Sequence, residues 1–217
     1  MTQALSDRIL AENAEVFDAM VGHRFVRDVA ADTLTVETFD RYLQIEGDFV
    51  ETAIAIFGYA VAKAPDIAAR RKLIAVLDAL ANEQIAYFER VTEARGITDE
   101  PALRSHPDVV AFGGGMLEIA RDGSYPEILA AMFAAEWMYL TWNDQVAADM
   151  PRDPDLRHWV DMHVSEGFRQ GAHWLKDSLD ALGTELSEQE KARCSEIFGR
   201  AQQLEIDFHS AAYVDEA

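Results

Sequence analysis

Apolar side chains recur three and four residues apart along most of this chain, and this period constrains its fold more than any other feature. A repeat of 3.6 residues is that of an amphipathic helix. No segment alternates between apolar and polar residues for long enough to indicate a strand. The prolines fall where the period lapses, as expected of residues that break helices: Pro65, Pro101, Pro107, Pro126, Pro151 and Pro154. The sequence therefore predicts an all-α protein.

Capping residues help to place the helix ends. Thr35, Asp66 and Ser187 suit N-caps, and Glu190 completes a capping box with Ser187. Gly96 and Gly183 stand where a helix often ends in a left-handed residue. No internal repeat or long linker interrupts the chain, so we expect residues 1–217 to form one compact helical bundle. The helices are expected over Gln3–Val21, Val36–Lys63, Ile67–Arg95, Val109–Arg121, Pro126–Ala148, Pro154–Leu182 and Ser187–Tyr213.

The chain is strongly acidic, with 39 Asp and Glu against 19 Lys and Arg and a formal net charge of −20. Such a charge repels phosphate backbones and anionic lipid surfaces, so we expect neither a nucleic-acid nor a membrane partner. A single cysteine, Cys194, cannot form an internal disulfide. With no signal-peptide pattern at the N-terminus, these features favour a cytoplasmic location.

Four predicted helices place an ionisable side chain in the middle of an apolar face. These side chains are Glu46, Glu136, the pair His163 and Glu166, and Glu205. A buried carboxylate is costly, and burial raises its pKa toward the range that is useful for proton transfer. Each of these glutamates taken alone is also explained as a boundary residue or as a hydrogen-bond partner of Tyr or Trp. Together they indicate a polar site inside the protein.

The chain resembles the TenA family, also called thiaminase II, in several motifs that occur in the same order. These are His23–Val26, Phe39–Leu43 leading to Glu46, Glu136–Tyr139, Trp159 with Ser165–Phe168, and Leu204–Phe208. The resemblance implies a heme-oxygenase-like helical bundle that assembles as a homo-oligomer, a dimer or tetramer. It also implies hydrolysis of a small-molecule aminopyrimidine in thiamin salvage, without a cofactor.

The resemblance also implies roles for individual residues. Glu46 stands where the family has its pyrimidine-binding Asp, Glu205 where it has an acid/base Glu, and Tyr139 where it has an active-site Tyr. Ala135 occupies the position of the nucleophilic Cys, so the chain is similar to the Cys-less branch in which a Glu replaces that Cys. Glu136 is the obvious substitute, although one residue corresponds to about 100° around a helix.

Three more positions differ from the better-characterised members, which carry tyrosines where this chain has Phe49, Phe112 and His163. We expect Glu46 to form two hydrogen bonds with the donor–acceptor edge of a 4-aminopyrimidine. Phe49, Phe112 and Tyr139 are expected to sandwich its ring.

For the hydrolysis itself, we expect Glu205 to act as the acid and Glu136 as the base. His163 is expected to orient one of these carboxyls or to take part in a proton relay.

Two alternatives remain open. The first is a di-iron oxidase or oxygenase, with iron as cofactor and Glu136, His163, Glu166, Glu205 and His209 as ligands, although their spacing differs from the usual Glu-x-x-His pairs. The second is a non-catalytic protein that binds a small heterocycle, because Ala135 replaces the nucleophile. A PqqC-like cofactor oxidation is a minor further alternative, since few basic residues lie on inward faces to hold a polycarboxylate.

Overall fold

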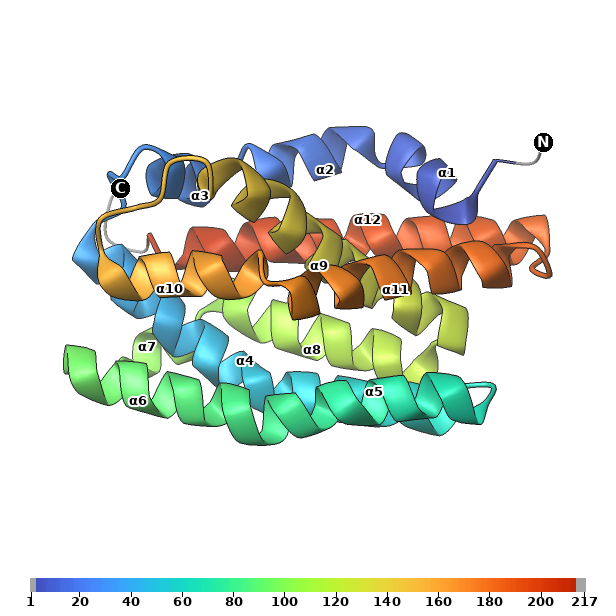
Figure 1. Cartoon of the computed structure of the whole chain (residues 1–217), viewed down its shortest axis with the longest axis horizontal. Helices are drawn as coiled ribbons and strands as arrows, with labels where there is room; N and C mark the ends of the chain where they lie inside the picture. Colours follow the sequence, from blue (N-terminus) through green and yellow to red (C-terminus); the bar gives the residue numbers. More distant parts are fainter. Residues whose placement is uncertain (1–2, 214–217) are drawn as a thin grey trace. The chain divides into compact units, whose positions relative to one another are not determined.

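The computed structural model describes residues 3–213, and within this range every regular element is a helix (Figure 1). The predicted all-α class is thus confirmed. The elements are α1 (Leu5–Glu12), α2 (Ala14–Val21), α3 (Arg24–Ala30), α4 (Val36–Lys63), α5 (Ile67–Ala79), a π-helical turn (Leu80–Gln84), α6 (Ile85–Arg95), α7 (Pro101–Arg104), α8 (Pro107–Asp122), α9 (Tyr125–Val146), α10 (Pro154–His163), α11 (Glu166–Gly183) and α12 (Glu188–Ala211).

The chain folds into two compact units, each built from segments that are distant in the sequence. Unit 1 contains the residues up to Leu34 together with Pro126–Ile206. Unit 2 contains Thr35–Tyr125 and the residues from Asp207 onward. Helix α12 supplies residues to both units. The expected single domain over residues 1–217 stays a prediction.

In unit 2, the long helix α4 is the element against which α5, α6, α7 and α8 pack. Its bounds agree with the sequence prediction, and the Thr35 hydroxyl accepts a hydrogen bond from the Thr38 N–H at 3.1 Å as the N-cap. At the other end, Lys63 Nζ donates to the carbonyl oxygens of Ala120, Arg121 and Gly123 at 2.9, 2.7 and 2.6 Å. This ammonium therefore satisfies carbonyl groups at the C-terminus of α8.

In unit 1, helix α9 contacts several other helices through aromatic rings. Its Phe133 lies 5.6 Å from Phe198 of α12 between ring centroids, and its Trp137 lies 5.3 Å from His173 of α11. The ring of Tyr139 in α9 lies 5.5 Å from that of Trp159 in α10. Aromatic pairs at these distances stabilise the packing beyond the effect of the apolar area that they bury. Helix α9 is therefore the centre of this unit.

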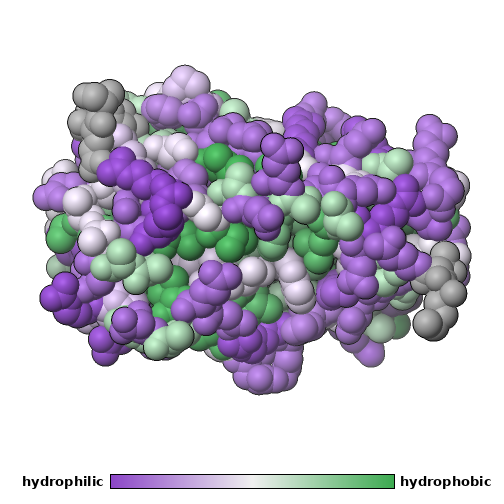
Figure 2. All heavy atoms as spheres, turned by 90° about the horizontal axis from the view of Figure 1, so that it is seen from above, coloured by the Kyte–Doolittle hydropathy of each residue, from purple (hydrophilic) through white to green (hydrophobic). Residues whose placement is uncertain are grey.

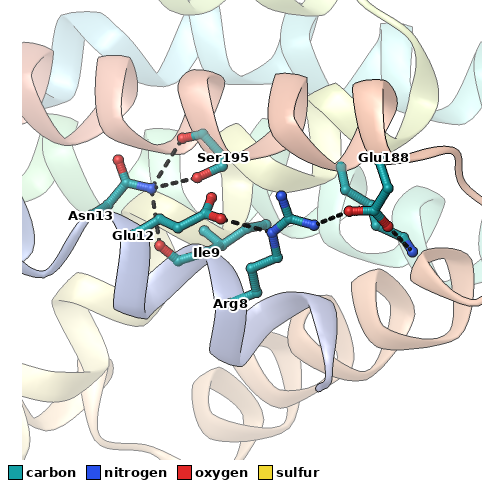
Figure 3. Close-up of polar contacts among 7 residues, drawn as sticks. Arg8, Ile9, Glu12, Asn13, Glu188 and Ser195 are labelled. Carbon is teal, nitrogen blue, oxygen red and sulfur yellow. Dashed lines mark hydrogen bonds and ion pairs between the residues drawn. The ribbon is translucent and has the colours of Figure 1, made fainter. Parts of the chain in front are cut away.

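The predicted helix over Gln3–Val21 is broken at Asn13, which separates α1 from α2. Asn13 Nδ2 donates to the Ile9 carbonyl at 2.9 Å and to the Ser195 hydroxyl and carbonyl at 2.9 and 3.1 Å (Figure 3). Nearby, Arg8 donates to Glu12 and Glu188 at 2.7 and 2.6 Å (Figure 3). The break is a tertiary effect, because two of the hydrogen bonds of Asn13 are made to Ser195 on α12.

The predicted helix over Pro154–Leu182 is also two helices, since α10 ends at His163 and α11 begins at Glu166. The Ser165 hydroxyl accepts a hydrogen bond from the Phe168 N–H at 3.3 Å and caps the new helix. Two short helices, α3 and α7, lie in segments where no helix was predicted. In the predicted helix over Ile67–Arg95, the π-helical turn lies between α5 and α6.

The prediction of a left-handed residue is confirmed at Gly96, whose φ is +68°, and wrong at Gly183. Gly183 is the last residue of α11, and it meets a different need. A Cβ atom added at Gly183 would lie 2.6 Å from Leu5 Cβ. The absence of a side chain therefore lets α1 and α11 approach each other closely.

Hydrophilic side chains predominate on the face of the molecule in Figure 2, as expected for so acidic a chain. Within residues 3–213, no helix is both long enough and apolar enough to cross a membrane.

Two glycines of α11 offer a matched test of its packing. We expect Gly183→Ala to lower the free energy of unfolding by about 1–3 kcal/mol, because the new methyl group overlaps Leu5. Gly171→Ala should raise the free energy of unfolding by about 0.5–1 kcal/mol, since nothing lies within 4 Å of its added Cβ and alanine favours a helix. Urea denaturation of both variants checks this, and equal effects would contradict the assigned close contact.

Candidate active site

Helices α9 and α12 run parallel within unit 1, and this places Glu136 and Glu205 within about one turn of each other along the helix axes. Glu127 pairs with Arg193 at 3.1 Å, Phe133 contacts Phe198, and Gln202 Nε2 donates to the Ala134 carbonyl at 2.6 Å. Each pairing joins residues 65 to 68 positions apart in the sequence. The same offset sets Glu205 level with residues 137–140 of α9, and Glu136 level with residues 201–204 of α12.

Glu136 lies on α9 in apolar surroundings, although its side chain is partly exposed. Burial raises the pKa of this carboxyl from 4.5 to about 7, and no charged or hydrogen-bonding neighbour contributes to that shift. Its sequence neighbours Ala135 and Trp137 are partly exposed as well, whereas residues 131–134 and 138–140 are buried. Glu136 is therefore a partly exposed carboxyl whose pKa lies near neutral pH.

Glu205 lies on α12 and is almost completely buried, with 2% of its surface exposed. Its burial agrees with the sequence prediction. Among the described residues, no Lys or Arg side chain is buried. Such an interior favours a ligand that donates hydrogen bonds.

His163, at the end of α10, packs against aromatic rings. Its ring centroid lies 3.9 Å from that of Trp159, 4.9 Å from that of Tyr139 and 4.9 Å from that of Phe168. His163 Nδ1 lies 2.8 Å from the Trp159 carbonyl oxygen. Because a carbonyl oxygen only accepts, Nδ1 carries the proton, and Nε2 is then the acceptor of a neutral ring. Burial lowers the pKa of His163 to about 4, which keeps the ring neutral at pH 7.

Glu46 and Phe49 occupy one face of α4 in unit 2. Both side chains are partly exposed, as is Ala53 on the same face one turn further. The prediction that Glu46 is buried is therefore wrong. The residues that directly precede Glu46 on α4, Tyr42 through Ile45, are buried. The face that carries Glu46 and Phe49 is only partly covered. This partial exposure leaves Glu46 accessible to a ligand.

Phe49 and Phe112 contact each other directly, with ring centroids 4.4 Å apart. Phe208 lies against them, at 4.4 Å from Phe112 and 6.4 Å from Phe49. A heterocycle therefore does not fit between Phe49 and Phe112, contrary to that part of the predicted sandwich. The three rings instead form one apolar wall within unit 2.

The residues of the alternative iron site are not brought together. Glu166 is exposed at the first turn of α11, where it accepts a hydrogen bond from Gln170 at 2.7 Å. Its predicted inward position is wrong because the chain breaks between α10 and α11. His209 is fully buried, and its ring lies 5.3 Å from that of Tyr42 in unit 2. Within residues 3–213, no three His, Cys, Asp or Glu side chains are grouped so as to hold a metal ion.

Sequence reasoning missed the site-forming roles of Trp159, Phe208 and Gln202. Trp159 and Phe208 lie in the motifs that carry the family resemblance, so their positions were available signals. Gln202 precedes Glu205 by one turn on α12, and the spacing of three residues places both on one side of the helix. That spacing was the signal for Gln202.

A hollow of about 740 Å³ lies elsewhere in unit 1, between α1, the end of α11 and the start of α12. Its charged residues include Arg8, Glu12, Glu188 and Lys191. Arg8 pairs with both glutamates, and Lys191 pairs with Glu188 at 2.9 Å. The hollow is lined by three carboxylates, Glu12, Asp180 and Glu188, and by two cations, Arg8 and Lys191, and it contains none of the predicted site residues.

Comparison with known proteins identifies relatives over nearly the whole chain. The model of the TENA/THI-4/PQQC family matches residues 11–215. The aminopyrimidine aminohydrolase of Halalkalibacterium halodurans is 24% identical over 212 residues, which cover 94% of this chain and 93% of that protein. The aminopyrimidine aminohydrolase of Bacillus subtilis is 21% identical over 210 residues, which cover 96% of this chain and 89% of that protein.

Solved structures show the same fold. A TenA homologue from Pyrococcus furiosus superposes with a TM-score of 0.88 at 22% identity, covering 96% of this chain and all of that chain. A TenA homologue from Pyrococcus horikoshii gives a TM-score of 0.85 at 18% identity, covering 98% of this chain and 99% of that chain.

The pKa of Glu136 predicts a pH-dependent stability. A carboxyl whose pKa is higher in the folded state than in the unfolded state makes the protein less stable as the pH rises from about 4.5 to about 7. Glu136→Gln removes this cost. We therefore expect the variant to gain up to about 3 kcal/mol relative to the wild type between pH 5 and pH 8.

The measurement is denaturant unfolding of both proteins at the two pH values. Glu166→Gln is the matched control, because this glutamate is exposed on the surface. A difference between wild type and Glu136→Gln that does not change with pH would show that Glu136 is not desolvated.

Proposed function

Since this chain belongs to the TENA/THI-4/PQQC family, we propose that it hydrolyses an aminopyrimidine, as the names of its relatives from two bacilli state for those proteins. The observation that carries the proposal is the placing of Glu136 and Glu205 within about one turn of each other along two parallel helices. One of these carboxyls is partly exposed and titrates near pH 7, and the other is buried. Two carboxyls in unlike environments can divide acid and base roles.

The proposed reaction breaks the bond between the methylene carbon of the substituent and the amine nitrogen. Glu136 takes a proton from water, the water oxygen bonds to the methylene carbon, and Glu205 gives a proton to the leaving amine. The products are a hydroxymethylpyrimidine and a free amine, so atoms and charge balance. A base whose pKa lies near the working pH is efficient, and this requirement suits Glu136.

Other residues are proposed to bind the ring. Glu46 accepts from the amino group and, when protonated, donates to the adjacent ring nitrogen. The apolar wall of Phe49, Phe112 and Phe208 stacks on one face of a flat heterocycle. Tyr139 and His163 contact each other in unit 1, and the neutral ring of His163 offers Nε2 as an acceptor for a proton relay. The expected homo-oligomer and cytoplasmic location stay predictions.

The non-catalytic alternative is favoured by one observation, the alanine at position 135 in place of a nucleophile. Its signature is tight binding of an aminopyrimidine without turnover. The proposed hydrolysis uses carboxyls and needs no metal. Elemental analysis of protein purified without a chelator tests this, since about two irons per chain would favour an oxidase or oxygenase instead.

Glu205→Gln tests the acid role. The amide retains the shape of the side chain but cannot donate the proton of a carboxyl, so we expect kcat for an aminopyrimidine to fall by about 10²- to 10⁴-fold. Unchanged binding of the product, measured by calorimetry, would separate lost proton transfer from lost structure. Turnover by Glu205→Gln at the wild-type rate would refute the role.

The pH profile tests the base role. We expect kcat/KM of the wild type to rise with pH through an apparent pKa near 7, as Glu136 loses its proton. In Glu136→Gln this ascending limb should disappear, and the remaining rate should be at least about 100-fold lower. An ascending limb that persists in the variant would assign the base to another group.

A further inference from the structure

Gln202 is a fully buried polar residue of unit 1 that the proposed reaction does not use. It lies on α12, and its Nε2 donates to the carbonyl oxygen of Ala134 on α9 at 2.6 Å. This bond fixes the orientation of the amide, because a flipped side chain would set two oxygens against each other. The acceptor Oε1 therefore has a defined direction.

Gln202 Oε1 is buried, and no donor within residues 3–213 reaches it. A desolvated acceptor without a donor costs about 1–3 kcal/mol. Native proteins retain few such groups, and a functional role is one established reason for retaining them. The amide is thus held ready to accept a hydrogen bond from a group that is not part of the protein's own packing.

The position of Gln202 Oε1 indicates which part of a ligand can reach it. Gln202 falls within the stretch of α12 that is level with Glu136, and it precedes Glu205 by one turn of the same helix. A buried amide elsewhere in the unit serves for comparison. Asn143 also has a buried Oδ1 without a donor among the described residues, but it lies two turns beyond Glu136 on α9, about 10 Å along the axis.

We propose that Gln202 Oε1 binds the leaving amine of the substrate and thereby selects ligands that carry an aminomethyl group. This inference rests on the proposed function and adds a residue that determines specificity. The interior of unit 1 suits an amine, since carboxyl and amide oxygens are present and no Lys or Arg side chain is buried there. An amine donates to these acceptors, whereas an alkyl group of the same size leaves them unsatisfied.

The test compares two ligands of the same shape. One is a 4-aminopyrimidine that carries an aminomethyl substituent, and the other is its analogue with an ethyl group in that place. Steady-state kinetics gives KM and kcat for the first, and inhibition gives Ki for the second. If the wild type does not turn over the amine, calorimetry gives both affinities instead.

In the wild type, we expect the amine to bind about 10- to 100-fold more tightly than the ethyl analogue. Gln202→Met should abolish most of this preference by weakening the amine alone, with Ki for the ethyl analogue within about twofold of the wild-type value. The matched control is Asn143→Leu, which should retain the wild-type preference even where it lowers Tm.

A merely structural Gln202 would give a different result. Gln202→Met would then lower Tm and change the affinities for both ligands in parallel, which overturns the inference. Equal binding of the two ligands by the wild type also overturns it, even if turnover is observed. Conversely, a preference for the amine that depends on Gln202, in a protein without turnover, would support the inference while the proposed hydrolysis fails.

Discussion

The arrangement in unit 1 depends on the placing of two carboxyl groups in unlike surroundings, with Glu136 partly exposed and Glu205 buried. No Lys or Arg side chain is among the buried residues of the described chain. Desolvation is therefore the dominant influence on Glu136, and it favours the protonated form at a pH where surface glutamates are ionised. A structural ion pair would have the opposite effect on the pKa, so this carboxyl is suited to proton transfer more than to stability.

The parallel pairing of α9 and α12 explains how the chain supports such a site. Three different contacts keep the register between these helices: the ion pair of Glu127 with Arg193, the packing of Phe133 on Phe198, and the hydrogen bond of Gln202 to a backbone carbonyl. On each helix, the residues that make these contacts come before the glutamate of the site, Glu136 on α9 and Glu205 on α12. Aromatic packing of Trp159 and Tyr139 against His163 adds rigidity on the side of α10. Proteins commonly accept a local loss of stability where a function requires it, provided that the surrounding packing is well determined.

The sequence predicted those features that depend on local interactions. Helix α4 has the predicted bounds because Thr35 caps its start and no Gly–Pro break interrupts its period. Breaks that depend on tertiary contacts were not predictable. At Asn13 the apolar period continues, and only the hydrogen bonds to Ser195 on another helix show why α1 ends there. The break after His163 likewise moved Glu166 from the expected inward face to the surface.

Burial was predictable for Glu205 but not for Glu46. The period of a helix indicates which side chains share a face. It does not indicate how completely another element covers that face. The same limit applies to Gln202. Its spacing from Glu205 places it on the inward side, but the direction of its amide depends on the carbonyl of Ala134, a backbone group that no side-chain pattern reports. Contacts between side chains and backbone groups of distant segments are thus the part of the site that a single sequence encodes least visibly.

The charge distribution of unit 1 also limits which ligands its interior can hold. Arginines such as Arg169 and Arg152 are paired with Asp144 and Asp32 on the surface. A phosphate ester or a polycarboxylate needs cationic partners, and transferring it to an interior that offers carboxyl and amide oxygens would leave its charge uncompensated. A neutral heterocycle with an amine substituent has the opposite character, because its donors meet acceptors that are already desolvated. The acceptor character of the site therefore becomes the basis of selection.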